Sequence, residues 1–193
     1  MSMRPLLVAA IAGASVFTLT AASCSRGTPM PSVGHVDLSR FMGDWYVIAH
    51  IPSRPERNAW NAVESYRLAD DGTVGTTFRY RSGRADAPLE TMHARGYVRP
   101  GTGNAVWGMQ FIWPIRAEYV VAYLDADYRE TIIARSARDY AWIMARTPTI
   151  PESDYRRLVS QLQSLGYATD ALRRVPQQWP EAVSTSSAPA AGD

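Results

Sequence analysis

The stretch Gly43-Asp-Trp-Tyr-Val-Ile-Ala-His-Ile51, closed by Pro52, is the first strong strand signal in the chain. Aromatic and β-branched side chains suit a pleated, half-buried surface, and a proline ends such a run because it cannot donate to a ladder. Further runs of the same kind follow in simple succession, separated by turn signals such as Asp70-Asp-Gly72. The predicted strands are 45–51, 62–68, 73–81, 90–98, 105–113, 117–124, 130–134 and 140–145.

One helix is predicted after these strands, over residues 149–165. Pro151 suits its first turn and Gly166 suits its end. Its apolar residues recur at helical spacing, so one face must pack on another element, namely Tyr155, Leu158, Val159, Leu162 and Leu165. The pattern favours an all-β fold: an eight-stranded up-and-down antiparallel β-barrel with one C-terminal α-helix packed on its wall.

Length and composition narrow the class of protein. A chain of 193 residues suits one domain with extensions at its ends. Twenty basic and eighteen acidic residues give a net charge of +2, which is too even for a nucleic-acid-binding surface. The single cysteine excludes an internal disulfide and a multi-cysteine metal site.

The N-terminus reads as a signal peptide. Arg4 precedes an apolar run that is too short for a good membrane span, and small residues follow it up to Cys24. Ala22-Ser-Cys24 resembles a lipoprotein box, which predicts lipid attachment at Cys24; ordinary cleavage after Ala22 is the alternative. The expected organisation is a signal peptide at 1–23, a tether at 24–35, the barrel and helix at 36–180 and a disordered tail at 181–193.

Three short motifs resemble the signatures of the lipocalin family, in the family's order and spacing. They are Gly43-Asp-Trp-Tyr46, then Asp127-Tyr128, where Ala126 replaces a usual threonine, and then Arg146. The stretch 139–148 is similar to bacterial outer-membrane lipoprotein lipocalins and to apolipoprotein D. The resemblance implies that Trp45 plugs the closed end of the barrel and that Arg146 stacks on it. It therefore assigns structural roles to Gly43, Trp45, Asp127, Tyr128 and Arg146.

The same resemblance implies a function. A barrel of this family holds a small hydrophobic ligand, for which we expect a fatty acid or a lysophospholipid, with no cofactor. The protein is expected in the cell envelope, anchored to a membrane by its N-terminal lipid. Ser25 follows the cysteine where an aspartate would favour retention, which by resemblance to lipoprotein sorting indicates the outer membrane, facing the periplasm. The sequence leaves the oligomeric state open.

Strand alternation gives a prediction for the residues that face the ligand. If Trp45 points inward, Val47 and Ala49 also do, and His50 faces outward. On the other strands, side chains of suitable parity or position complete the predicted ligand-binding set, which is Val47, Ala49, Met92, Ala94, Phe111, Tyr119, Trp142 and Met144. Plain core packing is the alternative for Trp142.

Three arginines are candidates for contact with a ligand head group. Arg54 and Arg57 lie in the loop after the first strand, where the fold carries its mouth-covering loop, and Arg116 follows Pro114 in another predicted rim turn. Guanidinium groups suit a carboxylate or a phosphate by their fork geometry. An ordinary solvated loop is the alternative.

Other functional classes find less support in the sequence. A lipocalin-fold enzyme that acts on a hydrophobic substrate is one alternative. No catalytic residue is predicted for it, because the serines lie outside a nucleophile elbow and the three histidines are scattered. A haem or metal carrier would depend on His93, the one axial candidate among the histidines, and a single histidine without a clear partner is more often a surface residue. A barrel that serves only as a scaffold for envelope interactions is a further alternative, because a fold does not fix a function.

Overall fold

The computed structural model describes residues 28–54 and 56–181. The predicted signal peptide, Cys24 and residues 182–193 of the predicted tail lie outside the described residues. Its main elements are α1 (Leu38–Phe41), β1 (Gly43–Ile51), β2 (Ala59–Leu68), β3 (Val74–Ser82), β4 (Leu89–Val98), β5 (Val106–Ile112), β6 (Ile115–Leu124), β7 (Glu130–Ala134), β8 (Ala141–Ala145) and α2 (Glu152–Ser164).

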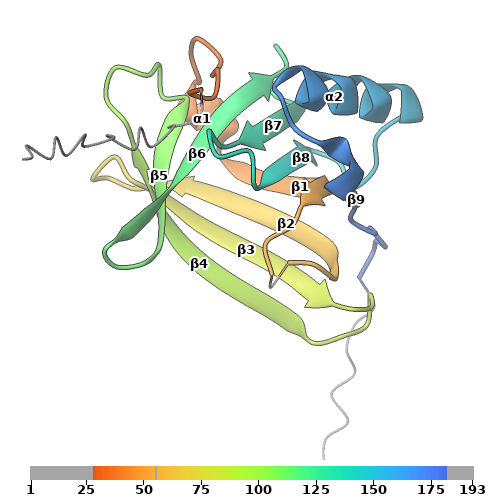
Figure 1. Ribbon diagram of the computed structural model, residues 1–193. Helices are drawn as coiled ribbons and strands as arrows, with labels where there is room; N and C mark the ends of the chain where they lie inside the picture. Colours follow the sequence, from red (N-terminus) through yellow and green to blue (C-terminus); the bar gives the residue numbers. More distant parts are fainter. Residues whose placement is uncertain (1–27, 55, 182–193) are drawn as a thin grey trace, which may run out of the picture.

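The strands form a closed antiparallel barrel (Figure 1). Each strand from β2 to β8 pairs with the next, and β1 pairs with both β8 and β2, which joins the two ends of the sheet. Closure removes the unpaired edges that an open sheet of this size would expose. The predicted fold class and the order of its elements are confirmed.

A bulge in β1 changes the direction of its side chains. Val47 pairs with Met144, but Ala49 pairs with Ile143, so Ile48 is an extra residue on this strand. Val47 packs in the interior cluster with Trp45, whereas Ile48 and Ala49 both pack in the outer cluster beneath α2. The expected inward direction of Ala49 is therefore wrong, because alternation holds only while the ladder is regular.

Helix α2 covers the outer face of the β7–β8 part of the wall (Figure 1). Leu158 and Leu162 are fully buried against the small or branched outward side chains of β8, which are Ala141, Ile143 and Ala145. The barrel wall thus carries apolar side chains on both faces here, one set for the interior and one for the helix.

The C-terminal segment fills a gap that the eight-strand plan leaves between β1 and β2. These strands pair only from Gly43 to Tyr46 on the β1 side, and beyond that point the short strand β9 (Arg173–Arg174) pairs with β1 instead. The Gln177 Nε2 then donates to the carbonyls of Val47, at 2.9 Å, and Ala62, at 3.2 Å. This segment, after the 3-10 turn η1 (Thr169–Ala171), was not predicted as a strand.

Part of the expected tether packs on the barrel. Met30 is buried with the outer cluster, and its N–H donates to Ser136 Oγ at 2.9 Å. Val33 N–H donates to the carbonyl of Val121 on β6 at 3.0 Å. The stretch 28–35 is therefore part of the domain, because its apolar residues find a surface that the proline-rich composition did not reveal.

The end of the barrel that holds α1 is closed by a cluster of aromatic rings. Trp45 is fully buried, and its Nε1 donates to the carbonyl of Phe41 at 2.8 Å. The Phe41 ring lies 5.0 Å from Trp45 and 5.6 Å from Trp107. Aromatic pairs at such distances add to the stabilisation from burial. These buried rings therefore plug the closed end of the barrel.

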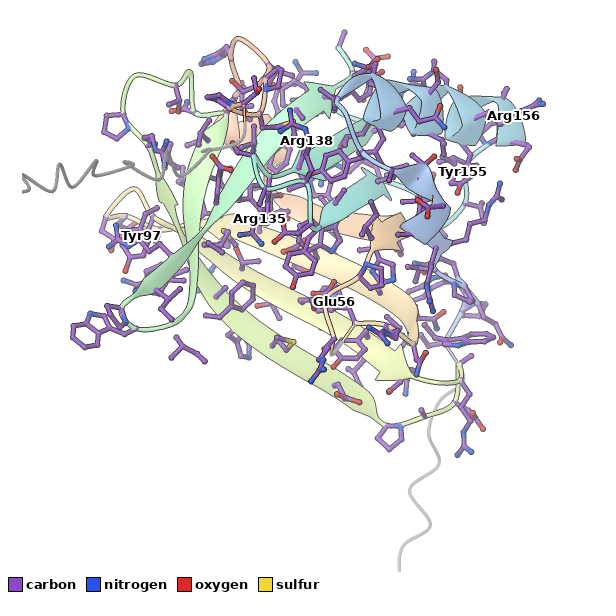
Figure 2. All side chains as sticks on the ribbon, in the orientation of Figure 1. Glu56, Tyr97, Arg135, Arg138, Tyr155 and Arg156 are labelled. Atoms are coloured by element: carbon purple, nitrogen blue, oxygen red, sulfur yellow. The ribbon has the colours of Figure 1, made fainter. Side chains whose placement is uncertain are left out.

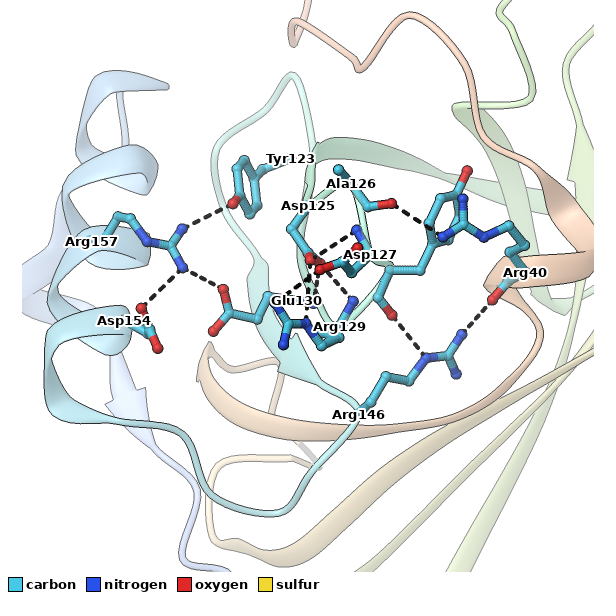
Figure 3. A network of polar contacts seen from close by, with 11 residues as sticks. Arg40, Tyr123, Asp125, Ala126, Asp127, Arg129, Glu130, Arg146, Asp154 and Arg157 are labelled. Carbon is cyan, nitrogen blue, oxygen red and sulfur yellow. Dashed lines mark hydrogen bonds and ion pairs between the residues drawn. The ribbon is translucent and has the colours of Figure 1, made fainter.

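Arg146 stacks on this plug from outside, with its Cζ 3.8 Å from the Trp45 ring. Its guanidinium donates to four backbone carbonyls, those of Arg40, Phe41, Asp44 and Tyr128, at 2.7–3.2 Å. Figure 3 shows this arginine beside the β6–β7 turn, which Asp125 holds by accepting from the N–H groups of Arg129 and Glu130. The placement expected of Trp45 and Arg146 is confirmed.

Gly43 is required where β1 begins. Its φ is +90°, a conformation that side chains with a Cβ rarely adopt, and a Cβ there would point at Arg146 Nη1. Tyr128 lies in the β6–β7 turn, as predicted. Its hydroxyl accepts a hydrogen bond from the N–H of Asp37 at 2.8 Å. These residues tie α1, the start of β1 and the β6–β7 turn into one unit.

Candidate ligand-binding cavity

A cavity of about 320 Å³ lies inside the barrel at the opposite end, which we call the open end. The turns at this end are 52–58, 83–88, 113–114 and 135–140. The volume falls at the low end of the range of about 300–1,000 Å³ that is typical of small-molecule sites. The lining residues are Ser53, Glu56, Glu64, Phe78, Met92, Met109, Phe111, Ala117, Glu118, Tyr119, Arg135, Tyr140 and Trp142.

One wall of the cavity is a row of side chains that cross from strand to strand. Glu64 on β2 pairs with Phe78 on β3, and Phe78 pairs with Met92 on β4. Directly paired residues point to the same face of a sheet, so all three point inward. Met109 on β5 continues this mostly apolar wall with a polarizable thioether that adapts to irregular ligands.

Glu64 places a carboxyl group in this otherwise apolar wall. Glu64 is 9% exposed, and burial raises the pKa of its carboxyl from 4.5 to about 7. A hydrogen bond with Tyr66 lowers this pKa in part, and the nearby charge of Glu56 raises it slightly. The charged form of a carboxylate is disfavoured where water cannot solvate it. Near neutral pH the floor of the cavity therefore exchanges between a charged and a neutral state.

Tyr119 lines the floor of the cavity, and its hydroxyl contacts that of Tyr66, which does not line the space. The oxygens of Tyr66 and Tyr119 lie 2.6 Å apart, and burial together with the nearby Glu64 raises both pKa values well above the ordinary value. Both phenols therefore remain neutral and can serve as donors. Tyr119 stacks on Trp107 at 5.0 Å, which connects the floor of the cavity to the aromatic plug.

Glu56 joins the loop after β1 to the rim of the cavity. It accepts from Trp142 Nε1 at 3.1 Å and from Ser53 Oγ at 2.9 Å. The ring of His50 is also buried here, with its Nδ1 3.7 Å from Glu56. The prediction that His50 faces outward is wrong, because the β1 bulge turns it toward the interior side.

Arg135 lines the cavity from the opposite part of the rim, the β7–β8 turn, and pairs with Asp139 at 3.1 Å. Figure 2 labels Glu56 and Arg135, the acidic and basic side chains that the two rim segments contribute. Glu118 on β6 accepts from Ser136, through the N–H at 2.6 Å and the hydroxyl at 3.0 Å. Three carboxyl groups and one guanidinium therefore border the space.

Half of the residues expected to face a ligand line the cavity. These are Met92, Phe111, Tyr119 and Trp142. Val47 and Met144 are fully buried within the interior cluster, and Ala94 packs against that cluster, so all three support the cavity without lining it. Ala49 lies in the outer cluster, as described above.

The three arginines expected near a head group do not line the cavity. Arg54 and Arg57 are exposed on the 52–58 turn at the open end. Arg116 belongs to β6 and not to a rim turn, and its guanidinium stacks on the outer wall over the Tyr97 ring at 3.5 Å. The turn between β5 and β6 consists only of residues 113–114, because Ile112 already pairs with Ile115. Arg116 therefore belongs to the paired part of β6.

His93, the candidate axial ligand, is exposed and lies beside Thr77 Oγ1 at 3.3 Å, on the outer face of β4. Within residues 28–54 and 56–181, no group of three or more His, Cys, Asp or Glu is arranged to hold a metal ion. The helices in this part of the chain are all too short or too polar to cross a membrane.

The carboxyl groups and the guanidinium that border the cavity were not predicted from the sequence. Glu64 carried a usable signal, because it shares parity with Tyr66 on β2 and sits in a run whose inward residues are otherwise apolar. Glu56 and Arg135 lie in turns, where strand alternation gives no direction.

Comparisons with known proteins agree with this architecture. The sequence model of the protein family described as lipocalin-like domain matches residues 36–177. The chain is 29% identical to the outer membrane lipoprotein Blc of Escherichia coli K12 over 168 residues, covering 86% of this chain and 93% of the relative. It is 30% identical to temperature-induced lipocalin-1 of Arabidopsis thaliana over 156 residues, covering 77% and 83%. Among solved structures, insecticyanin from the tobacco hornworm Manduca sexta shares the fold, with a TM-score of 0.62, 15% identity and coverage of 80% and 87%.

Proposed function

The chain belongs to the lipocalin family, and from this we propose that it binds one single-chain lipid, such as a fatty acid or a lysophospholipid, in the open-end cavity. The observation that carries the proposal is the cavity itself, about 320 Å³ in volume and walled by Phe78, Met92 and Met109. Each methylene that moves from water into such a wall gains about 0.8 kcal/mol. A two-chain lipid would exceed the space.

A carboxylate or phosphate head group belongs at the rim in this proposal, because an unpaired charge is too costly to bury. Arg135 is the cation that lines the cavity, and it takes the role that we expected of Arg54, Arg57 and Arg116. The tail then points toward Tyr119 and Glu64, whose carboxyl is most compatible with it when protonated. We infer binding and transport in preference to catalysis, because Glu56 and Glu118 are held by hydrogen bonds to the rim.

We also propose that Cys24 is acylated and holds the protein in the cell envelope, at the outer membrane and facing the periplasm. The relatives named outer membrane lipoprotein Blc support this, together with the Ala22-Ser-Cys24 box. Replacement of Cys24 by alanine should move the protein from the membrane fraction. An unmodified N-terminus on mass spectrometry of the wild type would contradict the anchor alone and leave the cavity proposal untouched.

Mass spectrometry of an organic extract of the native protein tests the cavity proposal. We expect one lipid per chain, and its loss in Ala117→Trp, which places an indole in the cavity. Thr91→Trp is the matched control, because this exposed neighbour of Met92 adds the same bulk outside the barrel. Equal lipid content in the two variants would show that the lipid is not held in the cavity.

A further inference from the structure

The hairpin between β5 and β6 exposes a continuous run of large apolar side chains. Phe111, Ile112, Trp113 and Ile115 are 50%, 73%, 82% and 70% exposed, and Pro114 lies among them. The other large apolar residues exposed on the described chain, Leu68, Leu89 and Trp179, stand apart from one another in the sequence and are 38–47% exposed. Single exposed apolar residues are ordinary, but a contiguous cluster marks an interaction surface.

This hairpin tip, residues 111–115, lies at the open end of the barrel and is continuous with the cavity. Phe111 lines the cavity and is also half exposed, so an apolar path leads from the tip to the interior. Figure 1 shows the β5–β6 hairpin projecting at the side of the barrel remote from α2. A surface that served only to stabilise the fold would not need this projection.

The N-terminal segment reaches the same end of the barrel. The carbonyl of Thr28 accepts from Arg138 Nη1 at 2.9 Å, and the Met30 N–H donates to Ser136 Oγ at 2.9 Å, both in the 135–140 turn. Cys24 precedes Thr28 by four residues, which can span at most about 14 Å. A lipid on Cys24 would therefore hold the membrane close to the open end.

The charges at this end suit a lipid surface. Arg54 and Arg57 are exposed on the 52–58 turn, and neither forms an ion pair with any described residue. Basic residues near a bilayer are attracted to anionic head groups, and tryptophan prefers the boundary between head groups and acyl chains. A protein partner would need no such combination of an apolar tip with free arginines beside an anchor.

We propose that the open end docks on a lipid bilayer, with Ile112, Trp113 and Ile115 inserted at the interface and the cavity mouth next to the lipids. Lipids then enter and leave the cavity directly from the membrane, without crossing water. This inference rests on the proposed lipid-binding function, and its tests are separate from those of the cavity.

Site-specific fluorescence in vesicles tests the docking. The chain has one cysteine, so in the acylated protein Ile115→Cys supplies a single free thiol for an environment-sensitive dye. In vesicles of phosphatidylethanolamine and phosphatidylglycerol we expect a blue shift and quenching by bromine-labelled lipid. The control is Asp70→Cys in the exposed turn at the closed end, which should show neither effect. Equal signals at the two positions would overturn the proposal.

Self-association of the tip would give a different signature. A blue shift at position 115 that appears without vesicles and grows with protein concentration would identify a second copy as the partner, and would also overturn the proposal. The wild type, treated with the same dye, should take no label; labelling there would mean that Cys24 is free, which concerns the anchor and not the tip.

Transfer kinetics test the consequence for function. Trp113→Asp changes a side chain that is 82% exposed and does not line the cavity, so the dissociation constant of a fluorescent fatty acid in solution should stay unchanged. Transfer of the fluorescent fatty acid from the Trp113→Asp variant to the same vesicles should be at least tenfold slower than from the wild type. Unchanged transfer with unchanged affinity would contradict docking, whereas lost affinity would contradict the cavity proposal.

Discussion

At the closed end of the barrel the aromatic rings fill the interior, and Arg146, which stacks on Trp45, uses its donors on backbone carbonyls. At the open end the rings line a space of about 320 Å³, and Glu64 has no comparable set of partners. The same strands build both ends. This barrel thus concentrates its stabilising contacts at one end and leaves the other end incompletely packed, as a binding site requires.

Truncation of the plug should have the largest effect on stability. Trp45→Ala removes a fully buried indole and should lower the free energy of unfolding by about 3–5 kcal/mol. Urea denaturation measures this change. Trp113→Ala is the matched control at the open end, and it should change stability by less than about 0.5 kcal/mol because that ring is 82% exposed. Similar losses in the two variants would remove the contrast between the ends.

Glu64→Gln should increase stability, and the increase should depend on pH. The folded protein raises the pKa of this carboxyl from 4.5 to about 7, so it binds a proton more tightly than the unfolded chain does. The contribution of Glu64 is fully present below pH 4.5 and is lost as the pH rises through 7. The variant should therefore gain up to about 3 kcal/mol over the wild type at pH 8 and nothing at pH 4.5.

The control for this variant is Glu118→Gln, which makes the same chemical change at the rim. Its carboxylate accepts two hydrogen bonds from Ser136, so its loss should not stabilise the protein at pH 8. Denaturant titrations at both pH values separate the two sites. A stabilisation by Glu64→Gln that stays constant from pH 4.5 to 8 would show that the titration of Glu64 is not its cause.

Arg146→Ala should cost about 2 kcal/mol, less than loss of the plug itself. The guanidinium contributes bonds to carbonyls and stacks at 3.8 Å on the Trp45 ring. Arg40→Ala removes a more exposed arginine that stacks at 4.1 Å on Tyr128, and it should cost less than 1 kcal/mol by the range of about 0.5–1 for exposed cation–π pairs. Thermal unfolding of both variants measures the two losses of stability. A larger loss for Arg146→Ala would show that the position of the arginine–aromatic pair, and not only its chemistry, determines its contribution to stability.

Arg57→Ala should have the smallest effect, and only on anionic ligands or membranes. The side chain is exposed and lies outside the cavity, so the dissociation constant of a neutral long-chain alcohol should not change. Any weakening for a fatty acid should fade at high salt, where exposed charges are screened. Fluorescence titration at low and high ionic strength makes the comparison, and a salt-independent loss for the alcohol would mean that Arg57 shapes the cavity.

The positions of the key residues at the closed end could be predicted from the sequence, whereas several of those at the open end could not. Trp45, Tyr128 and Arg146 stand in short motifs whose positions follow from the order of strands, and the structure brings them together. The open end depends on features without such a pattern. One extra residue, Ile48, reverses the direction of Ala49 and His50, and no local signal distinguishes a bulge from a regular strand.

The other differences have the same origin in tertiary packing. Gln177 lies within the predicted domain, but no contact was predicted for it. Its side chain donates to the carbonyls of Val47 and Ala62, which are free to accept because β1 and β2 no longer pair beyond Tyr46. Met30 stands in a proline-rich stretch typical of a tether and is buried only because β6 and the 135–140 turn offer it a surface. Turn residues such as Glu56 and Arg135 supply the charge of the cavity, and strand alternation cannot orient them.

If the open-end cavity holds one lipid chain, the affinity for a fatty acid must depend on the length of its acyl chain. Saturated fatty acids of increasing length are titrated below their micellar concentrations against the wild type and Ala117→Trp. We expect the affinity to rise about fourfold per methylene and then to level off once the cavity is full, at a shorter chain in the variant. Affinity that is independent of chain length, or the same plateau in both proteins, would contradict this expectation.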